Sequence, residues 1–437
     1  MADAVRRSAG ADRGGAVTMS QPVSVRMPLR EFIRSSGMIS IGVALARLLG
    51  FGFSMVLARV LIPEDYGFIQ YSLTLANFVA LLTIPFGQHV LARFIGGVKD
   101  QPEDLQAFLS TAWIMLLGLV GVTLLVAVPV LALIGRLNLG VIVVFLGFTL
   151  HFGYYGLARG FLAPGRLTIA YLGSNVVQLI AIVLVYVVLR ETSPMPALII
   201  YGASYLLPIA LLQWRHPFPM RFRLALPDRA SVRRVLKYAA PIWASHVAYI
   251  LYAGVDVLLI QHFLGDAAVG VYALTKTLTM LLSFVPTGIS TVLLPRIAAE
   301  QRGGHLPLVR NTILASLGVN ALVLVVMVIG YQPFIRLVFD EVYVVPLIVL
   351  LLLALSEIAF GVHGIVTAVL LGSDQPQWET VSRVVVVIVS VLAGVILIPR
   401  WGLTGAALMM ALGGVAANLT YLSLWLLKDT RHAVVHV

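Results

Sequence analysis

Residues 56–97 read VLARVLIPEDYGFIQYSLTLANFVALLTIPFGQHVLARFIGG and set the organisation of the whole chain. An apolar segment ends near Arg59, a short acidic turn follows at residues 63–67, and a second apolar segment runs to Arg93. About 20 apolar residues in a helix are enough to cross the hydrocarbon core of a bilayer. The stretch therefore predicts a hairpin that crosses a membrane twice and carries a polar tip.

The same pattern returns later in the chain, where residues 257–299 read VLLIQHFLGDAAVGVYALTKTLTMLLSFVPTGISTVLLPRIAA. An offset of 203 residues aligns the two stretches without a gap around their turns. Matching residues are Gly67 and Gly270, Thr74 and Thr277, Leu75 and Leu278, and Arg93 and Arg296. Internal duplication of this kind is typical of transporters, so we expect two copies of one membrane unit.

The composition is that of a membrane protein rather than of a soluble one. Of the 437 residues, 60% are hydrophobic and only 11% are charged, whereas soluble domains carry about 25% charged residues. The mean hydropathy is +0.98. Cysteine is absent, which excludes disulfides, thiol catalysis and cysteine-bound metal. We expect no cofactor and no metal site.

Twelve apolar runs predict an all-α integral membrane protein with two pseudo-symmetric lobes of six helices around a central cavity. The predicted spans are 38–61, 67–92, 109–134, 139–158, 167–189, 194–213, 239–261, 269–294, 311–331, 344–371, 381–399 and 403–427. Short connections leave almost no chain for a soluble domain on either face. The predicted lobes are residues 37–213 and 238–427.

Basic residues orient the bundle, because Lys and Arg near span ends are retained in the cytoplasm. With the amino terminus inside, twenty-three of them fall on the cytoplasmic side and four fall outside, namely Arg136, Arg190, Arg336 and Arg400. Both termini are therefore predicted to be cytoplasmic. This topology explains the net charge of +11 without nucleic-acid binding.

Three segments outside the lobes are rich in basic or polar residues. Residues 1–36 and 428–437 are expected to be cytoplasmic tails, the first of them disordered. Residues 214–237 form a basic linker, in which Val232 and Leu236 alternate with Arg233 and Lys237. This pattern favours a short interfacial helix that is attracted to anionic membrane lipids.

Arg47 is a cation inside the first predicted span. An arginine at mid-bilayer costs about 2.5–3.5 kcal/mol on insertion scales, so its side chain is expected to point into a wet cavity or at a partner. A purely structural ion pair, or a side chain that reaches to the membrane surface, explains it as well. We take Arg47 as a candidate for binding an anionic substrate.

The seventh predicted span carries a polar stripe, Ser245, Tyr249, Tyr252 and Asp256, at spacings of four, three and four residues. These spacings place all four on one helix face. The next span supplies Lys276, and we expect it to pair with Asp256. The pair is either a static salt bridge or a pair that a substrate or coupling cation shares during transport. Tyr249 and Tyr252 are further substrate-binding candidates.

Glu357 is a second carboxylate inside a predicted span. Intramembrane acids commonly mark proton or ion pathways. Asp256 and Glu357 are therefore our candidates for coupling transport to a cation, either sodium or a proton.

Four motifs resemble the oligosaccharide and polysaccharide flippases of the multidrug/oligosaccharidyl-lipid/polysaccharide exporter superfamily. They are LARVLIPEDYG at 57–67, VGVY at 269–272, LLPR at 293–296 and IPRWGLTGAA at 398–407. The motifs are short, and their order and spacing over residues 37–427 carry the resemblance.

The resemblance implies alternating access in the bacterial cytoplasmic membrane. The implied cargo is a polyprenyl-pyrophosphate-linked oligosaccharide, such as an O-antigen, capsule or exopolysaccharide repeat unit, which moves from the inner to the outer leaflet. It also implies that cations in the cavity bind the pyrophosphate, and Arg47, Arg59 and Lys276 are the candidates here. A polysaccharide polymerase and other assembly proteins are the implied partners.

Several rival functions remain open, among them a passive assembly scaffold, against which the costly intramembrane charges argue. A multidrug exporter of the same superfamily carries mostly cationic cargo, and we expect a cavity richer in Arg and Lys than in acids, which argues against it. A membrane polysaccharide polymerase or ligase needs a sizeable external loop with catalytic side chains, and every predicted external loop is short. A lipid II flippase also fits the cargo class.

Overall fold

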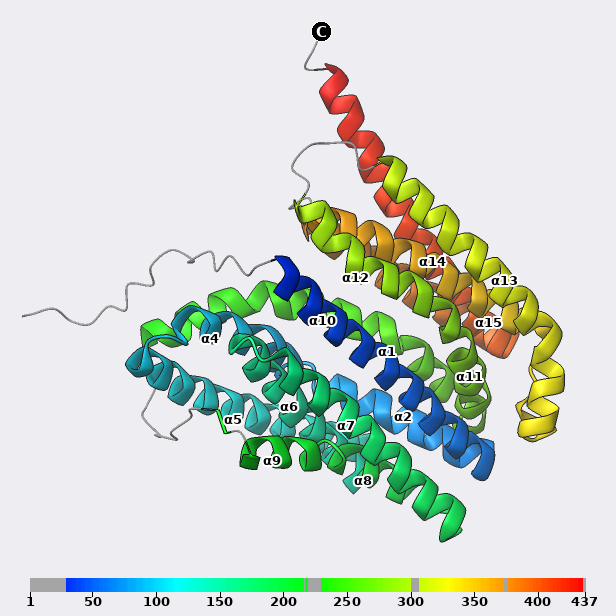
Figure 1. Cartoon of the computed structure of the whole chain (residues 1–437). Coiled ribbons are helices and arrows are strands. Elements are labelled where there is room, and N and C mark those ends of the chain that lie inside the picture. Colours follow the sequence, from blue (N-terminus) through cyan, green and yellow to red (C-terminus); the bar gives the residue numbers. More distant parts are fainter. Residues whose placement is uncertain (1–28, 216, 219–228, 300–305, 373–375, 435–437) are drawn as a thin grey trace, which may run out of the picture.

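The computed structural model describes residues 29–215, 217–218, 229–299, 306–372 and 376–434, and all regular elements in these ranges are helices (Figure 1). The first half contains α1 (Leu29–Val60), α2 (Pro63–Val79), α3 (Thr83–Pro85), a π-helix (Phe86–Leu91), α4 (Ala92–Val98), α5 (Pro102–Leu133), α6 (Leu139–Gly160), α7 (Pro164–Ile182), a second π-helix (Val183–Val188), α8 (Met195–Ala203) and α9 (Leu206–Arg215). The second half contains α10 (Arg229–Leu264), α11 (Asp266–Thr279), a 3-10 turn (Met280–Ser283), α12 (Phe284–Ala299), α13 (Leu306–Val338), a 3-10 turn (Glu341–Tyr343), α14 (Leu347–Gly372) and α15 (Pro376–Val434).

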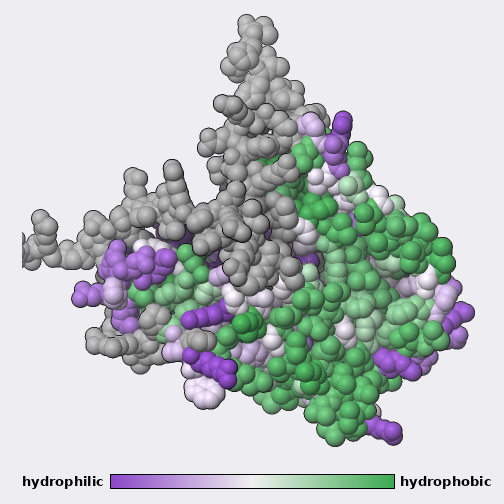
Figure 2. Space-filling model, in the orientation of Figure 1, coloured by the Kyte–Doolittle hydropathy of each residue, from purple (hydrophilic) through white to green (hydrophobic). Residues whose placement is uncertain are grey.

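The outer surface of the bundle is apolar over most of its height. Figure 2 shows a broad hydrophobic face with hydrophilic residues gathered toward its margins. Large aliphatic side chains on α5 and α13 are among the most exposed, including Leu125 at 76% and Ile329 at 72%. Exposed apolar area of this extent is suited to lipid rather than to water. The protein is a multi-pass membrane protein.

Within the described ranges, nine helices are long and apolar enough to cross a membrane, or ten if the bent pair α2 and α3–α4 forms one span. The long helix α15 is bent at Gly402, whose backbone angles are φ 56° and ψ −133°. Glycine adopts this left-handed region without a Cβ clash. The predicted spans 381–399 and 403–427 lie on the two sides of this bend. The count of twelve spans stays a prediction.

The duplicated hairpin is visible in the helices themselves. α2 begins at Pro63 and α11 begins at Asp266, which is the same offset of 203 residues, so Gly67 and Gly270 are each the fifth residue of their helix. Both helices are then interrupted at nearly the same repeat position. The first break bends the chain by 63°, just before Pro85, whose missing N–H leaves a carbonyl of the preceding turn free.

The two lobes meet where these hairpins turn, which we call the hairpin end of the bundle. α2 packs on α11 more extensively than any other helices of opposite lobes do. Gly67 and Gly270 allow this approach, because a Cβ on Gly67 would lie 1.8 Å from the carbonyl oxygen of Asp266. Figure 1 shows the crossing between α4–α9 on one side and α12–α15 on the other.

Polar contacts between the lobes add to the packing at the hairpin end. Arg136 Nη1 lies 2.8 Å from Asp266 Oδ2. The Tyr343 hydroxyl donates to the carbonyl oxygen of Leu61 at 3.1 Å. Burial raises the pKa of Tyr343 above its usual range, so the hydroxyl keeps the proton that it donates. The lobes are therefore held together by apolar, ionic and hydrogen-bond contacts at this end.

At the opposite end, which we call the terminal end because α1 begins and α15 ends there, the cores of the two lobes are separate. One cluster of buried residues joins α4–α7 to the first turns of α10. Another, around Ile365, joins α12, α13 and α14. In the described part of the chain, apolar packing between the lobes is thus concentrated at the hairpin end.

Helix α10 connects the lobes and contacts both. Its first half lies on the first lobe, where Trp243 Nε1 donates to the Leu82 carbonyl oxygen in the helix break at 3.0 Å and Tyr238 packs edge-on against Phe94. Its second half packs against α11 and α15 of the second lobe.

Helices extend beyond three of the predicted boundaries. α1 begins at Leu29, inside the predicted tail 1–36, and α15 continues to Val434, through most of the predicted tail 428–437. α10 begins at Arg229, so the predicted interfacial helix is its first turns and the boundary after Lys237 falls inside it. Around Arg229 and Val434 the described helices contain no Gly or Pro that would end them where the apolar run ends, and α1 continues through Gly37. Residues 1–28 and 219–228 lie outside the described ranges.

Candidate functional site

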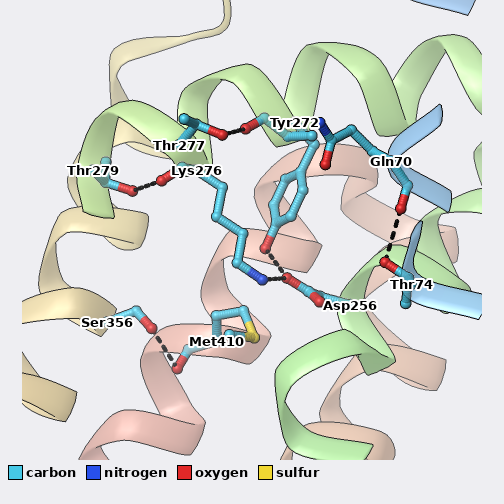
Figure 3. Close-up of polar contacts among 10 residues, drawn as sticks. Gln70, Thr74, Asp256, Tyr272, Lys276, Thr277, Thr279, Ser356 and Met410 are labelled. Carbon is cyan, nitrogen blue, oxygen red and sulfur yellow. Dashed lines mark hydrogen bonds and ion pairs between the residues drawn. The ribbon is translucent and has the colours of Figure 1, made fainter. Parts of the chain in front are cut away.

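Asp256 on α10 and Lys276 on α11 form the ion pair that the sequence predicts. Asp256 is completely buried, and its Oδ2 accepts hydrogen bonds from Lys276 Nζ at 2.5 Å and from the Tyr272 hydroxyl at 2.9 Å (Figure 3). Tyr272 and Lys276 are four residues apart, so both project from one face of α11 toward α10. The predicted pair between Asp256 and Lys276 is confirmed.

The two partners of this pair differ in accessibility. The Lys276 side chain is 20% exposed, whereas that of Asp256 is 0% exposed. The second carboxylate oxygen, Oδ1, is buried without a hydrogen-bond partner among the described residues. The charge of the buried Asp256 carboxylate is compensated by Lys276 alone among the described charged groups at hydrogen-bond distance. Because only Lys276 of the pair is partly exposed, only Lys276 can also contact a bound ligand.

Arg47 lies on α1, across the lobe interface from α12. Its Nη1 donates to Thr287 Oγ1 at 3.3 Å, and its side chain is nevertheless exposed. Arg47 therefore contacts the second lobe and stays accessible from the space between the lobes. This placement agrees with the expectation of a partner or a wet surrounding.

Glu357 on α14 joins these charges. It is half-buried and interacts with the Ser283 hydroxyl and, through space, with Lys276 and Arg47. Two cations and two carboxylates thus occupy one region between the lobes. We call Arg47, Asp256, Lys276 and Glu357 the central cluster.

The central cluster holds equal numbers of cations and acids. The sequence predicted a cavity richer in Arg and Lys than in acids, which concerns the whole lining and stays a prediction. Buried or half-buried cations in a membrane need counter-charges, because unpaired ions pay a large desolvation cost. Net charge here does not discriminate between anionic and cationic cargo.

The two candidate tyrosines lie in different surroundings. The ring of Tyr252 packs against Phe360 with 4.5 Å between centroids, and its hydroxyl is within electrostatic range of Asp256 and Glu357. Tyr249 is 46% exposed and its ring faces Arg383, whose Cζ lies 5.2 Å from the ring centroid. The structure brings Tyr252 to the central cluster and Tyr249 to Arg383.

Arg59 stands apart from the central cluster. It is twelve residues beyond Arg47 on the same helix, which corresponds to about 18 Å along the axis. Its side chain is exposed, and no hydrogen bond or ion pair joins it to the residues that the structure describes. The structure does not bring Arg59 together with the other candidates.

Sequence reasoning did not select Tyr272 or Arg383. Tyr272 was noted only as part of a family motif, although its position one turn before Lys276 places it beside the ion pair. Arg383 was counted only as a topology charge, although Glu379 precedes it by four residues. In both cases a spacing of one helical turn was the available signal.

A family model described as polysaccharide biosynthesis protein matches residues 32–301, more than half of the chain. The chain belongs to this family. The match confirms the family that the sequence motifs indicate, and it includes Arg47, Asp256 and Lys276 of the central cluster. Glu357 lies beyond the matched residues.

One relative aligns with part of the chain. It is a probable low-salt glycan biosynthesis flippase, Agl15, of Haloferax volcanii, and the two chains are 24% identical over 193 residues. The aligned part is 43% of this chain and 41% of the relative, so the match spans about two fifths of the relative's length.

Solved structures share the fold at low sequence identity. A lipid II flippase MurJ in an inward closed conformation matches with a TM-score of 0.68 and 15% identity, over 87% of this chain and 86% of that one. An inward-facing multidrug resistance MATE family transporter of the MOP superfamily matches with a TM-score of 0.63 and 14% identity, over 88% and 96%. An outward-facing one matches with a TM-score of 0.57 and 15% identity, over 89% and 93%. The fold is therefore that of this transporter superfamily.

Proposed function

We propose that this protein is a flippase for a polyprenyl-pyrophosphate-linked oligosaccharide in a bacterial cytoplasmic membrane. It moves the headgroup from the inner to the outer leaflet by alternating access between its two lobes. Membership of the polysaccharide biosynthesis family and the alignment with a glycan biosynthesis flippase support this class of cargo.

The observation that carries the proposal is the placement of Arg47 and Lys276. Arg47 on α1 contacts Thr287 of the other lobe. Lys276 on α11 pairs with Asp256, and both cations keep exposed surface. Guanidinium and ammonium groups are the side chains that bind phosphate best. A pyrophosphate that enters between the lobes can reach these two cations, whereas Asp256 is completely buried.

The physical chemistry of the cargo explains why such a site is needed. A pyrophosphate and its sugars are strongly hydrated, and an ionised group carried through hydrocarbon pays a severe desolvation cost. Cations between the lobes replace part of that hydration. An inside-negative potential also favours outward movement of negative charge by about 2.3 kcal/mol per charge per 100 mV.

The carboxylates of the central cluster suggest how a cation is coupled to this cargo. Asp256 engages Lys276, and Glu357 lies within range of both Lys276 and Arg47. A sodium ion or a proton that neutralises either carboxylate releases its cation for the phosphate. Asp256 and Glu357 are therefore the coupling residues of the proposal.

Packing between the lobes suggests which side is open. The hairpin end is closed by the crossing at Gly67 and Gly270, and the cores at the terminal end are separate. The distribution of Arg and Lys in the sequence supports a cytoplasmic position for the terminal end. This conformation accordingly receives cargo from the cytoplasmic leaflet.

The test replaces Arg47 by Ala in the native host, with the chromosomal copy deleted. Because Arg47 is exposed and forms a single side-chain hydrogen bond, we expect a folded protein at normal level. Exported polysaccharide should fall by at least about tenfold, which corresponds to the loss of one charge-assisted phosphate contact. Lipid-linked repeat units should accumulate inside the cell.

Arg400→Ala is the matched control, because Arg400 is an exposed arginine beside the bend of α15 at the hairpin end. It should export normally. Normal export by Arg47→Ala at equal protein level would remove the proposed role. Intact polysaccharide together with increased sensitivity to cationic drugs would instead favour a multidrug exporter. Loss of polymer while repeat units still reach the outer leaflet would favour a polymerase or ligase.

A further inference from the structure

A second group of polar side chains lies on α10, α14 and α15, toward the terminal end. It consists of His246 on α10, His363 on α14, and Glu379 and Arg383 on α15, with Tyr249 beside them. We call these five residues the His–Arg cluster. None of its charged residues was among the sequence candidates.

Arg383 is the cation of this cluster, and two contacts hold it. Its Nη2 forms an ion pair with Glu379 Oε1, one helical turn earlier on α15. Its guanidinium also lies over the ring of Tyr249, with 5.2 Å between Cζ and the centroid. The Arg383 side chain remains 27% exposed, compared with 15% for Glu379. The guanidinium is therefore both oriented and reachable.

The histidines bring unused ring nitrogens to the cluster. His363 stacks on Tyr421 with 4.5 Å between centroids and 8° between planes, and Tyr421 is fixed by a 2.9 Å hydrogen bond with Thr367. His246 lies 5.9 Å from the ring of Tyr249. His363 Nδ1 and His246 Nε2 are buried and have no hydrogen-bond partner among the described residues.

Buried polar atoms in proteins nearly always have a partner, so two that lack one in the same place call for an explanation. Both histidines lie within electrostatic range of Arg383. An imidazole nitrogen can donate a proton to an acceptor oxygen, and a guanidinium offers further donors. An acceptor-rich, negatively charged group would engage the Arg383 guanidinium together with whichever of these ring nitrogens carries a proton.

Depth separates the His–Arg cluster from the central cluster. His246 precedes Asp256 by ten residues on α10, which is about 15 Å along the axis, and His363 follows Glu357 by six residues on α14, about 9 Å. On both helices the displacement is toward the terminal end. α10 and α14 therefore each carry titratable side chains at two levels.

We propose that the His–Arg cluster is an entry site that binds the phosphate groups of the lipid-linked cargo before they reach Arg47 and Lys276. This inference rests on the proposed flippase function and adds a second phosphate site to it. Arg383 supplies the charge, His246 and His363 supply neutral donors, and Tyr249 and Glu379 orient the guanidinium. When phosphate binds, it competes with Glu379 for Arg383.

Competition with Glu379 distinguishes this proposal from a merely structural ion pair. If Arg383 and Glu379 only stabilise α15, replacing either one weakens the fold and improves no binding. If Arg383 binds phosphate, Glu379→Gln removes both a competitor and a repulsive charge. The two replacements then change phosphate affinity in opposite directions.

The experiment measures binding of farnesyl pyrophosphate to the purified full-length protein by isothermal titration calorimetry. Arg383→Gln should raise the Kd by about tenfold, and Arg383→Lys by less, because one charge-assisted contact is lost or weakened. Glu379→Gln should lower the Kd by about threefold. Arg310→Gln, an exposed arginine on α13 at the same end, is the control and should stay within about twofold.

Several results would overturn the proposal. Unchanged affinity in Arg383→Gln, or weaker affinity in Glu379→Gln, would overturn the proposed entry site. The proposed flippase function would still stand if Arg47→Gln weakens binding of the probe. Failure of the unmodified protein to bind the probe overturns both. In another outcome, phosphatidylglycerol displaces the probe as well as unlabelled farnesyl pyrophosphate does, and loses this ability in Arg383→Gln. That result would assign the His–Arg cluster to ordinary membrane lipid instead of cargo.

Discussion

At the scale of single residues, the ion pair between Asp256 and Lys276 means that replacing either residue affects stability as well as transport. Asp256 is fully buried, and its only charged partner at hydrogen-bond distance among the described residues is Lys276. Breaking a buried ion pair by removing one partner costs about 3–5 kcal/mol, because an uncompensated charge stays inside. Loss of transport in a Lys276 variant therefore does not by itself show that Lys276 binds cargo.

A double replacement separates the two effects. Lys276→Met should lower the unfolding free energy by about 3–5 kcal/mol, visible as a lower Tm of the purified protein. Combining it with Asp256→Asn removes both charges and should restore most of the lost stability. Polysaccharide export should stay low in the double variant, because the cation and the coupling carboxylate are gone. A stable double variant with normal export would reduce the pair to a structural role.

At the scale of elements, the duplicated hairpins serve to join the lobes. The turn at residues 63–67 carries conspicuous charges, but the two copies share Gly67 and Gly270 rather than those charges. A Cβ on Gly270 would lie 2.0 Å from the carbonyl oxygen of Pro63. The backbones of α2 and α11 contact each other directly at this crossing. A change of rotamer therefore cannot make room for a side chain at Gly67 or Gly270.

Gly67→Ala should therefore destabilise the closed hairpin end. A Cβ at 1.8 Å from Asp266 O forces the two helices apart, and overpacking of this kind costs about 1–3 kcal/mol. Thermal unfolding of the purified protein measures the loss. Gly121→Ala in α5 is the control, since a Cβ there meets nothing within 4 Å, and it should be neutral or slightly stabilising. Equal Tm values for the two variants would show that the helices do not cross this closely.

At the scale of the whole molecule, alternating access requires the hairpin end to open. Arg136 and Asp266 lie on opposite lobes and form an ion pair there at 2.8 Å. The chain has no cysteine of its own, so introduced thiols can be joined without background. A bridge between these two positions holds the lobes in the conformation described here.

We expect Arg136→Cys with Asp266→Cys to transport normally until a short, cleavable bifunctional thiol reagent links the two residues. Export should then fall to background and return after cleavage, because the cargo can enter but cannot leave. Arg336→Cys with Glu341→Cys is the matched control, since this 3.7 Å pair lies within one lobe and both side chains are exposed. Undiminished export by the linked Arg136 and Asp266 variant would contradict alternating access at this end.

The amino-acid sequence by itself determined the membrane class, the helices, the internal repeat and the family. These properties depend on local or periodic features of the sequence. The length of an apolar run indicates a membrane span, and a constant offset between similar segments indicates a duplication. It also determined the pair between Asp256 and Lys276, because one tight turn joins their helices and the spacing fixes their faces. The helices extend past the predicted tail and linker boundaries to Leu29, Arg229 and Val434, since hydropathy marks the edge of a membrane and not the end of a helix.

Only the tertiary structure decided which charges share a site. Arg47 contacts Thr287, 240 residues away, and Glu357 joins Lys276 from a helix that no spacing rule connects to α11. Arg59, a substrate-binding candidate at the outer end of the first predicted span, lies far along the same helix from Arg47. Arg383 lies beside Tyr249 and near the two histidines only in the folded chain, and this neighbourhood is the basis of the proposed entry site. Such contacts depend on how helices cross, and crossing is set by close packing, as at Gly67 and Gly270, over the whole bundle rather than by any one segment.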